Sequence, residues 1–376
     1  SSLPAEIGQL TNLSVLDLQD NSLSSLPVEI VQLTNLSVLD LNSNSLSSLP
    51  AEIGQLTNLS VLDLQDNSLS SLPAEIGQLT NLSELYLNSN SLSNLPAEIG
   101  QLTNLSKLYL NSNSLPIPPE ILEKADEPAA IINYYLSLQN DQQKPLHEAK
   151  MLLVGQGNVG KTCVRERLIR NKYDSERNKT DGIDIEPWEI EINNNKYQIN
   201  VWDFGGQEIM HSTHQFFLTK RSLYLLVVDT TLGEEENRIE YWLKIIQSFG
   251  KDSPVIIVGN KADQHILDID QRGLQKKYPQ IKGFYETACN RKLKNGIPEL
   301  ETKIIQEISQ LEHIDDVLPL PWFNVKQGLE KIDRDFIPYH DYEKLCDDQG
   351  IKKEDNQRVL IRPLARIRIL AVSAII

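Results

Sequence analysis

The chain has 376 residues, of which 40% are hydrophobic and 23% charged, and its formal net charge is −16. This length exceeds what one hydrophobic core supports, so we expect about two to three domains. Its three cysteines form no CxxC pair, which favours a reducing compartment over secretion. No apolar run reaches about 18 residues and no signal peptide pattern opens the chain, so we expect a cytoplasmic protein without a membrane span.

Residues 1–118 are built from a 23-residue repeat, LPAEIGQLTNLSVLDLQDNSLSS, which begins at Leu3. Its kernel, LxxLxLxxNxL, starts first at Leu13 and resembles the leucine-rich repeat family. Each kernel is expected to supply a short strand whose leucines enter a shared core, while the LPAEIGQL half returns along the convex side. The turn asparagines should stack as a ladder that satisfies backbone groups; they are Asn21, Asn44, Asn67, Asn90 and Asn113.

The outward strand positions of the repeats form two columns on the expected concave face. One column contains Asp17, Asp40, Asp63, Tyr86 and Tyr109, and the other contains Val15, Val38, Val61, Glu84 and Lys107. Tyrosine beside aspartate suits recognition of a protein partner, whose identity the sequence does not give. The alternative is that near-identical repeats simply carry near-identical surface residues.

The repeats hold eleven acidic side chains and one lysine, a charge of −10 that repels nucleic-acid phosphates. We therefore expect no nucleic-acid partner. We favour a solubilising role for this charge over a dedicated site for a basic partner. The chain opens within a repeat without a polar cap, which predicts an excised or incomplete chain.

A different pattern occupies residues 119–146. Apolar spacing at Ile131, Tyr135 and Leu138 predicts a connecting helix, partly packed on the repeats, and the polar residues DQQK then form a short linker.

The segment GQGNVGKT, residues 155–162, lies between a buried-strand pattern and a helical one, the setting that a phosphate-binding loop requires. Gly155 and Gly160 let the backbone curl so that its N–H groups surround phosphates at a helix N-terminus. Lys161 is expected to contact the β- and γ-phosphates and the Thr162 hydroxyl to coordinate Mg²⁺. The predicted nucleotide-binding residues of this loop are Gly155, Gln156, Gly157, Asn158, Val159, Gly160, Lys161, Thr162 and Cys163.

The sequence Asn260-Lys261-Ala262-Asp263 ends another apolar strand and indicates which base is bound. The Asp263 carboxylate can accept two hydrogen bonds from guanine, whereas adenine has no such donor pair on that edge. This NKxD pattern resembles the guanine-specificity element of Ras-like GTPases, which implies GTP and GDP as ligands. The resemblance also implies that Asn260 braces the loops and that the stem of Lys261 covers the base.

The segment FYETACN resembles the ETSAK element of the same proteins. It implies that Ala288 and Cys289 line the base, with the Cys289 N–H facing the guanine oxygen. Asn290 stands where these proteins usually have lysine.

The segment YQINVWDFGGQE places Asp203 at a strand end near the expected Mg²⁺ site. By resemblance, the Gly206 N–H senses the γ-phosphate and Gln207 orients the attacking water. Gly157 leaves room for that glutamine. Thr180 is the candidate switch I residue for Mg²⁺ and the γ-phosphate. Catalysis is thus expected from Gln207, Lys161 and Thr180, and metal binding from Thr162, Thr180 and Asp203.

The order of elements predicts an α/β fold with a doubly wound, mostly parallel six-stranded sheet. Strands are expected at about 150–154, 222–228, 254–258 and 282–286, with a hairpin that turns at residues 193–195.

Leucine-rich repeats followed by TDGIDI, WDFGGQE and a further segment are similar to the Roco family, of prokaryotic type. The resemblance implies leucine-rich repeats over 1–118, a connecting segment over 119–146, a Roc GTPase domain over 147–312 and the start of a COR domain over 313–376. In the family COR mediates dimerisation, so a homodimer is expected if COR is complete. The ending RPLARIRILAVSAII departs from the family and predicts a truncation or frameshift.

The leading hypothesis for function is a GTP-hydrolysing switch in intracellular signalling, with the repeats as its regulator or partner-binding module. The alternative is a nucleotide-stabilised scaffold in which hydrolysis is incidental. An ATPase of the immune-receptor type is weaker, because NKAD disfavours adenine. No kinase motif occurs. Hydrolysis is expected to be slow, since no arginine finger is assignable and Arg165, Arg167 and Arg177 are expected at the surface.

Overall fold

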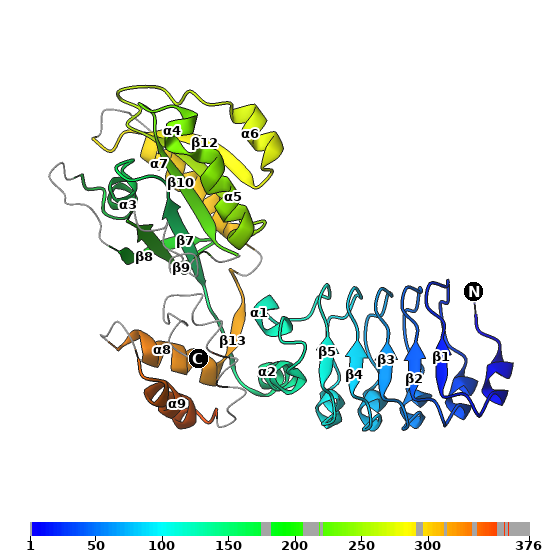
Figure 1. The fold of residues 1–376 in the computed structure, drawn as a ribbon. Coiled ribbons are helices and arrows are strands. Elements are labelled where there is room, and N and C mark those ends of the chain that lie inside the picture. The colour runs from blue at the N-terminus through cyan, green and yellow to red at the C-terminus, as the bar shows by residue number, and fades with distance from the viewer. Residues whose placement is uncertain are drawn as a thin grey trace. The chain divides into compact units, whose positions relative to one another are not determined.

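The computed structural model describes residues 2–173, 182–205, 218, 221–290, 296–311, 314–332, 337–351, 357 and 360. Their contacts divide them into two compact units (Figure 1). The described residues of 2–144 and 318–360 form the first unit, and those of 145–317 form the second.

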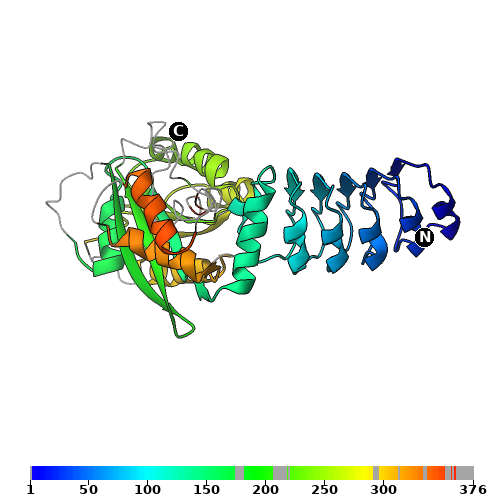
Figure 2. The same ribbon diagram turned by 90° about the horizontal axis from the view of Figure 1, so that it is seen from below.

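Five short parallel strands form one sheet in the repeats of the first unit, in the order β1-β2-β3-β4-β5. They are β1 (Val15–Asp17), β2 (Val38–Asp40), β3 (Val61–Asp63), β4 (Glu84–Tyr86) and β5 (Lys107–Tyr109). A 3-10 helix precedes each strand; these are η1 (Ala5–Gln9), η2 (Val28–Gln32), η3 (Ala51–Gln55), η4 (Ala74–Gln78) and η5 (Ala97–Gln101). The helices stack on the side away from the strands (Figure 2), as predicted for a leucine-rich-repeat solenoid.

The predicted asparagine ladder is confirmed at four of its five positions, whereas Asn21 donates to Leu18 and Gln19 within its own turn. The Asn44 side-chain amide donates to the Leu18 carbonyl at 2.9 Å, and its oxygen accepts from the Leu23 backbone at 2.9 Å. The equivalent bonds recur at Asn67, Asn90 and Asn113. Because each asparagine joins its own turn to the preceding repeat, the ladder satisfies backbone groups that no strand partner reaches.

Helices α1 (Pro119–Leu122) and α2 (Pro128–Asn140) follow the repeats. The side chains that carried the helical spacing, Ile131, Tyr135 and Leu138, are all buried. The Tyr135 hydroxyl accepts from the Leu95 N–H at 2.7 Å, which fixes α2 to the last repeats. The later helices of this unit are α8 (Leu320–Glu330) and α9 (Tyr339–Asp348), and Trp322 of α8 packs edge-on against Tyr134. A two-stranded sheet joins β6 (Gln143–Pro145) to β13 (Val317–Pro319).

The second unit contains a six-stranded sheet in the order β12-β11-β10-β7-β9-β8. Its strands are β7 (Glu148–Val154), β8 (Ile183–Ile192), β9 (Asn195–Phe204), β10 (Leu223–Asp229), β11 (Val255–Asn260) and β12 (Ile281–Thr287). Only the β8–β9 pair is antiparallel among the described strands of this sheet. Its hairpin turns at Asn193 and Asn194, both with positive φ, while Asn195 already pairs with Ile192. The turn is thus one residue shorter than predicted.

Helices cover both faces of this sheet, so the predicted doubly wound arrangement is confirmed (Figure 1). They are α3 (Lys161–Arg170), α4 (Glu234–Asn237), α5 (Ile239–Gly250), α6 (Gln271–Lys277) and α7 (Gly296–Ser309). Val164 of α3 and Leu300 of α7 belong to one hydrophobic core, and Trp242 of α5 and Leu274 of α6 belong to the other. Because successive parallel strands share a direction, the loops after β7, β10, β11 and β12 meet at one edge of the sheet.

Candidate nucleotide site

At two positions of the loop after β7, the backbone has a conformation that glycine alone adopts without strain. Gly155 has a φ of 138°, and a Cβ there would lie 2.2 Å from the Val227 carbonyl oxygen. Gly160 has a φ of 92°, and its Cβ would lie 2.3 Å from the side-chain nitrogen of Asn260. The loop is therefore pressed against the neighbouring strands, and its glycines meet both a conformational and a steric requirement.

Lys161 opens α3 and is almost completely buried beneath the loop. Its ammonium donates to the carbonyls of Gly155 and Gln156, both at 2.9 Å. Burial lowers the pKa of Lys161 to about 8, while the nearby Asp203 carboxylate opposes this shift. A phosphate would restore the charge of such an ammonium, which is the property that a phosphate-binding lysine needs.

Asp203 lies near the end of β9 and is fully buried. Burial raises the pKa of this carboxyl, against the opposing effects of the Thr162 hydroxyl and of the charges on Arg165 and Lys161. Within the described residues, neither carboxylate oxygen has a hydrogen bond of ordinary geometry. A buried carboxylate beside a threonine hydroxyl is a hard oxygen pair of the kind that Mg²⁺ prefers, so these two residues fit the predicted ion.

Asn260 connects three loops at the same edge of the sheet. Its amide donates to the Val159 carbonyl at 2.9 Å. Its oxygen accepts from the Thr287 hydroxyl at 3.3 Å and the Cys289 thiol at 3.4 Å. The bracing role expected of Asn260 therefore has a direct geometric basis between the phosphate loop and the β12 loop.

Lys261 and Asp263 follow Asn260 at the end of β11. The Lys261 ammonium pairs with the Asp229 carboxylate at the end of β10, and this pairing helps to lower the pKa of Asp229 against its burial. Asp263 is half-buried and accepts a hydrogen bond from the Asn290 amide at 2.7 Å.

Ala288 and Cys289 are buried just beyond β12. Burial raises the pKa of the Cys289 thiol to about 12. At neutral pH this thiol is therefore protonated, and it donates to Asn260. The role of both residues in binding the base stays a prediction.

The structure places the described candidates of the site on one edge of the sheet. Thr180, Gly206 and Gln207 lie outside the described residues, as does Arg177. Gln156 and Asn158 are partly or fully exposed on the loop, as is Gly157.

Arg165 corrects one expectation from the sequence, because it is not at the surface. Its side chain is 1% exposed and meets Asp184 at 2.6 Å, Glu166 at 3.3 Å, and both Glu186 and Asp203 at 3.6 Å. The acidic residues at alternate positions in IDIEPWEI, facing arginines of the preceding helix, are the signal that could have revealed this network. Arg167 is partly exposed and donates to the Asn171 carbonyl at 3.1 Å.

Two more residues of the site lay outside the sequence prediction. The Asp229 carboxylate forms an ion pair with Lys261. The Asn237 side chain accepts from the Asp229 N–H at 2.8 Å and donates to the Asp229 carbonyl at 2.9 Å. The signal for Asp229 was its position at the end of an apolar strand next to the strand that carries NKAD.

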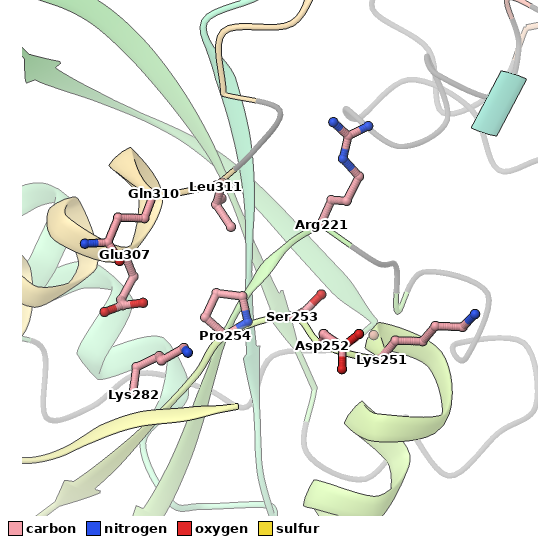
Figure 3. A pocket seen from close by; sticks show the side chains of 10 residues that line it. Arg221, Lys251, Asp252, Ser253, Pro254, Lys282, Glu307, Gln310 and Leu311 are labelled. Atoms are coloured by element: carbon pink, nitrogen blue, oxygen red, sulfur yellow. The ribbon is translucent and has the colours of Figure 1, made fainter. Parts of the chain in front are cut away.

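A hollow of about 490 Å³ lies at the opposite, amino-terminal edge of strands β10–β12 (Figure 3). Arg221 and Lys251 point away from Lys282 in this hollow, and Arg221 pairs with Asp316 at 3.0 Å. Glu307 is likewise neutralised by Lys303 at 2.6 Å. These charges point apart or are already paired, so they do not converge on one anion. The hollow also differs from the phosphate loop in position, because it lies at the other edge of the sheet.

Three family models match the chain. Residues 150–263 match Roc, described as the Ras of Complex, Roc, domain of DAPkinase. Residues 38–123 match a leucine-rich repeat region and residues 12–33 match a leucine-rich repeat.

Two curated proteins are similar to part of this chain. A Roc-COR-CHAT protease of an unknown prokaryotic organism is 31% identical over 263 residues, which are 62% of this chain and 24% of that protein. A probable serine/threonine-protein kinase, pats1 of Dictyostelium discoideum, is 36% identical over 54% of this chain and 7% of its own length. The chain thus spans about a quarter or less of these two relatives.

The solved structure of Methanosarcina barkeri Roco2 RocCORdC bound to GDP is 41% identical to this chain. The match has a TM-score of 0.55 and covers 60% of this chain and 69% of that one. The site and the matches define a leucine-rich-repeat protein with a Ras-like GTPase domain. The chain belongs to the Roco family, whose order is leucine-rich repeats, Roc and COR. In the described part of the chain, every helix is too short or too polar to cross a membrane.

Proposed function

We propose that this chain is a slow, Mg²⁺-dependent GTPase whose nucleotide state regulates protein binding by the leucine-rich repeats. The observation that carries the proposal is that Lys161 and Asp203 lie close together, while Asn260 bonds the phosphate loop to the end of the strand that leads to Asp263. GDP in the related Roco2 structure supports the choice of guanine.

In this proposal the phosphates lie against the N–H groups of the glycine loop and Lys161. Thr162 and Asp203 hold Mg²⁺, which supplies neutralisation of the charge on the phosphate oxygens when bound. Asp263 reads the guanine edge. By family resemblance, Thr180 and Gly206 contact the γ-phosphate side and Gln207 orients the attacking water.

We expect slow turnover because Arg165, the buried arginine near the site, is already engaged in ion pairs. Arg165 is surrounded by carboxylates, the closest at 2.6 Å, so it could reach a transferring phosphate only by giving up its ion pairs with Asp184, Glu186 and Asp203. An arginine finger is worth about 10³–10⁵ in rate, and Arg165 does not supply one while this network is intact.

The repeats offer a surface for a protein partner. Tyr86 and Tyr109 stack with centroids 5.0 Å apart and planes 5° from parallel, and Lys107 pairs with Glu84 at 3.2 Å. Rigid aromatic side chains bordered by charges are typical of protein recognition sites. A homodimer through Roc and COR and a cytoplasmic location belong to the same proposal.

The test is phosphate release from GTP by the full chain with Mg²⁺, alongside Gln207→Ala. A switch predicts slow turnover that falls at least about tenfold in the variant, as for loss of a water-positioning group. Hydrogen exchange of residues 174–181 and 206–220 should also be slower with a non-hydrolysable GTP analogue than with GDP. Nucleotide binding without any difference in exchange would favour the alternative, a nucleotide-stabilised scaffold.

A further inference from the structure

The Asn290 amide contacts the carboxylate that is expected to read the base. Its nitrogen lies 2.7 Å from Oδ2 of Asp263, and both side chains are half-buried. We propose that Asn290 is a positioning residue that orients Asp263 and thereby sets the preference of this site for guanine over hypoxanthine. This inference rests on the guanine-binding function proposed above and adds to it a residue that determines specificity.

The contact is built into the register of the sheet. Asn260 of β11 pairs with Thr287 of β12, and Asp263 and Asn290 each lie three residues beyond this pair. The Ala262 N–H donates to the Thr287 carbonyl at 3.1 Å, which ties the two loops between these points. The two side chains therefore meet because their strands are neighbours and their loops advance equally.

The chemistry of the pair fixes which group donates. An ionised carboxylate only accepts hydrogen bonds, so the amide must present its nitrogen to Asp263. The bond is charge-assisted, and such bonds are stronger than those between neutral groups. A carboxylate has about four lone-pair positions, so the single bond from Asn290 does not by itself prevent Asp263 from accepting from a base.

Orientation of the carboxylate matters because guanine presents two parallel donors. Both oxygens of Asp263 can accept from N1–H and from the exocyclic amine only when the carboxylate lies in the plane of the base. The terminal torsion of aspartate has a broad distribution, so an unrestrained carboxylate rotates out of that plane. The bond from Asn290 restricts this rotation before the nucleotide binds, which reduces the ordering cost of binding.

Inosine diphosphate distinguishes this role from a general effect on the loop. Its base, hypoxanthine, has N1–H but lacks the exocyclic amine, so it needs only one oxygen of Asp263. Loss of orientation should therefore weaken GDP more than inosine diphosphate, whereas loss of loop structure should weaken both equally.

The test measures displacement of mant-GDP from the full chain with Mg²⁺ by GDP and by inosine diphosphate. Asn290→Ala should weaken GDP by about tenfold, the value of a charge-assisted hydrogen bond, and should lower the ratio of GDP to inosine diphosphate affinity by several-fold. Asn290→Asp has nearly the same shape but should weaken GDP further, because two carboxylates this close repel each other. Gln264→Ala, at an exposed neighbour of Asp263, is the matched control and should leave the ratio unchanged.

Circular dichroism melts establish that each variant is folded. Equal losses for the two nucleotides in Asn290→Ala, or an unchanged GDP affinity, would overturn this proposal while the guanine-binding function stands. A folded wild-type chain that binds neither nucleotide would instead overturn the proposed function, and this inference with it.

Discussion

Arg165 of α3 donates to the carboxylate of Asp184 on β8 at 2.6 Å. In the sequence, one of these residues precedes and the other follows the segment that carries Thr180. Burial alone would lower the pKa of Arg165, but the hydrogen bond to Asp184 and the charge of Asp203 outweigh it, so the guanidinium remains charged. Arg170 adds a second connection, to Glu186 at 2.7 Å. The helix after the phosphate loop is thus tied to strand β8, close to the carboxylate predicted to hold Mg²⁺.

Removal of the buried charge at Arg165 should destabilise the Roc domain strongly. Arg165→Met removes the buried positive charge beside Asp203, Glu186 and Glu166, and breaking a buried pair from one side typically costs about 3–5 kcal/mol. Arg170→Met is the control, since that side chain is half-exposed and its pair should contribute about 0–1 kcal/mol. Urea unfolding followed by tryptophan fluorescence measures both, and similar losses would argue against a buried network.

A methyl group at Gly160 should abolish nucleotide binding. Gly160→Ala forces a side chain onto a φ of 92° and against the Asn260 amide, so the bond from Asn260 to Val159 must break. The backbone strain alone costs about 1–3 kcal/mol, and we expect mant-GDP affinity to fall by about 100-fold or more. Gly233→Ala is the control, because its φ is −70° and its new Cβ would lie 3.6 Å from Glu236. Retention of affinity in Gly160→Ala would contradict the described loop geometry.

Nucleotide affinity should fall as the pH rises through about 8, the value to which burial lowers the pKa of Lys161 from 10.5. Burial disfavours the charged amine, so the nucleotide-free folded chain releases this proton above pH 8 while the unfolded chain retains it up to about 10.5. This group therefore makes the nucleotide-free fold more stable as pH rises across that window, yet weakens phosphate binding because the amine becomes neutral. GDP affinities from pH 7 to 9 test this, with Lys161→Met expected to be weaker and flat. A parallel slope in the variant would assign the effect to another group.

Loss of a ladder asparagine should destabilise the repeats more than loss of an exposed one in the same repeat. Asn67→Ala removes the donor to Leu41 and the acceptor of the Leu46 N–H, both at 2.9 Å, and each unsatisfied group costs about 1–3 kcal/mol. Asn58→Ala removes one exposed bond to Thr34, worth about 0.5–1.5 kcal/mol. Urea titrations followed by circular dichroism compare the two, and equal midpoints would show that the ladder adds no stability.

Local sequence patterns predicted most of the fold and the backbone of the site. The repeat period located the strands and the asparagine ladder, because each unit repeats one physical solution. The glycines of the phosphate loop were predictable because few other residues accept their backbone angles.

Contacts between distant segments were not predicted. The burial of Arg165 depends on the packing of α3 beside the acidic residues of β8, whereas the sequence alone suggested a surface position. The Asn290–Asp263 bond depends on the register of β11 and β12, which no local motif specifies. Such pairs arise from tertiary packing, which motifs taken one at a time do not describe.

The central claim, that the site is selective for guanine nucleotides, is tested most directly by equilibrium binding of mant-GDP and mant-ADP to the purified chain with Mg²⁺, beside Asp263→Ala. We predict micromolar or tighter mant-GDP binding, at least about 100-fold weaker mant-ADP binding, and loss of that preference in the variant. Equal binding of the two nucleotides by the wild-type chain, or an unchanged preference in Asp263→Ala, would contradict it.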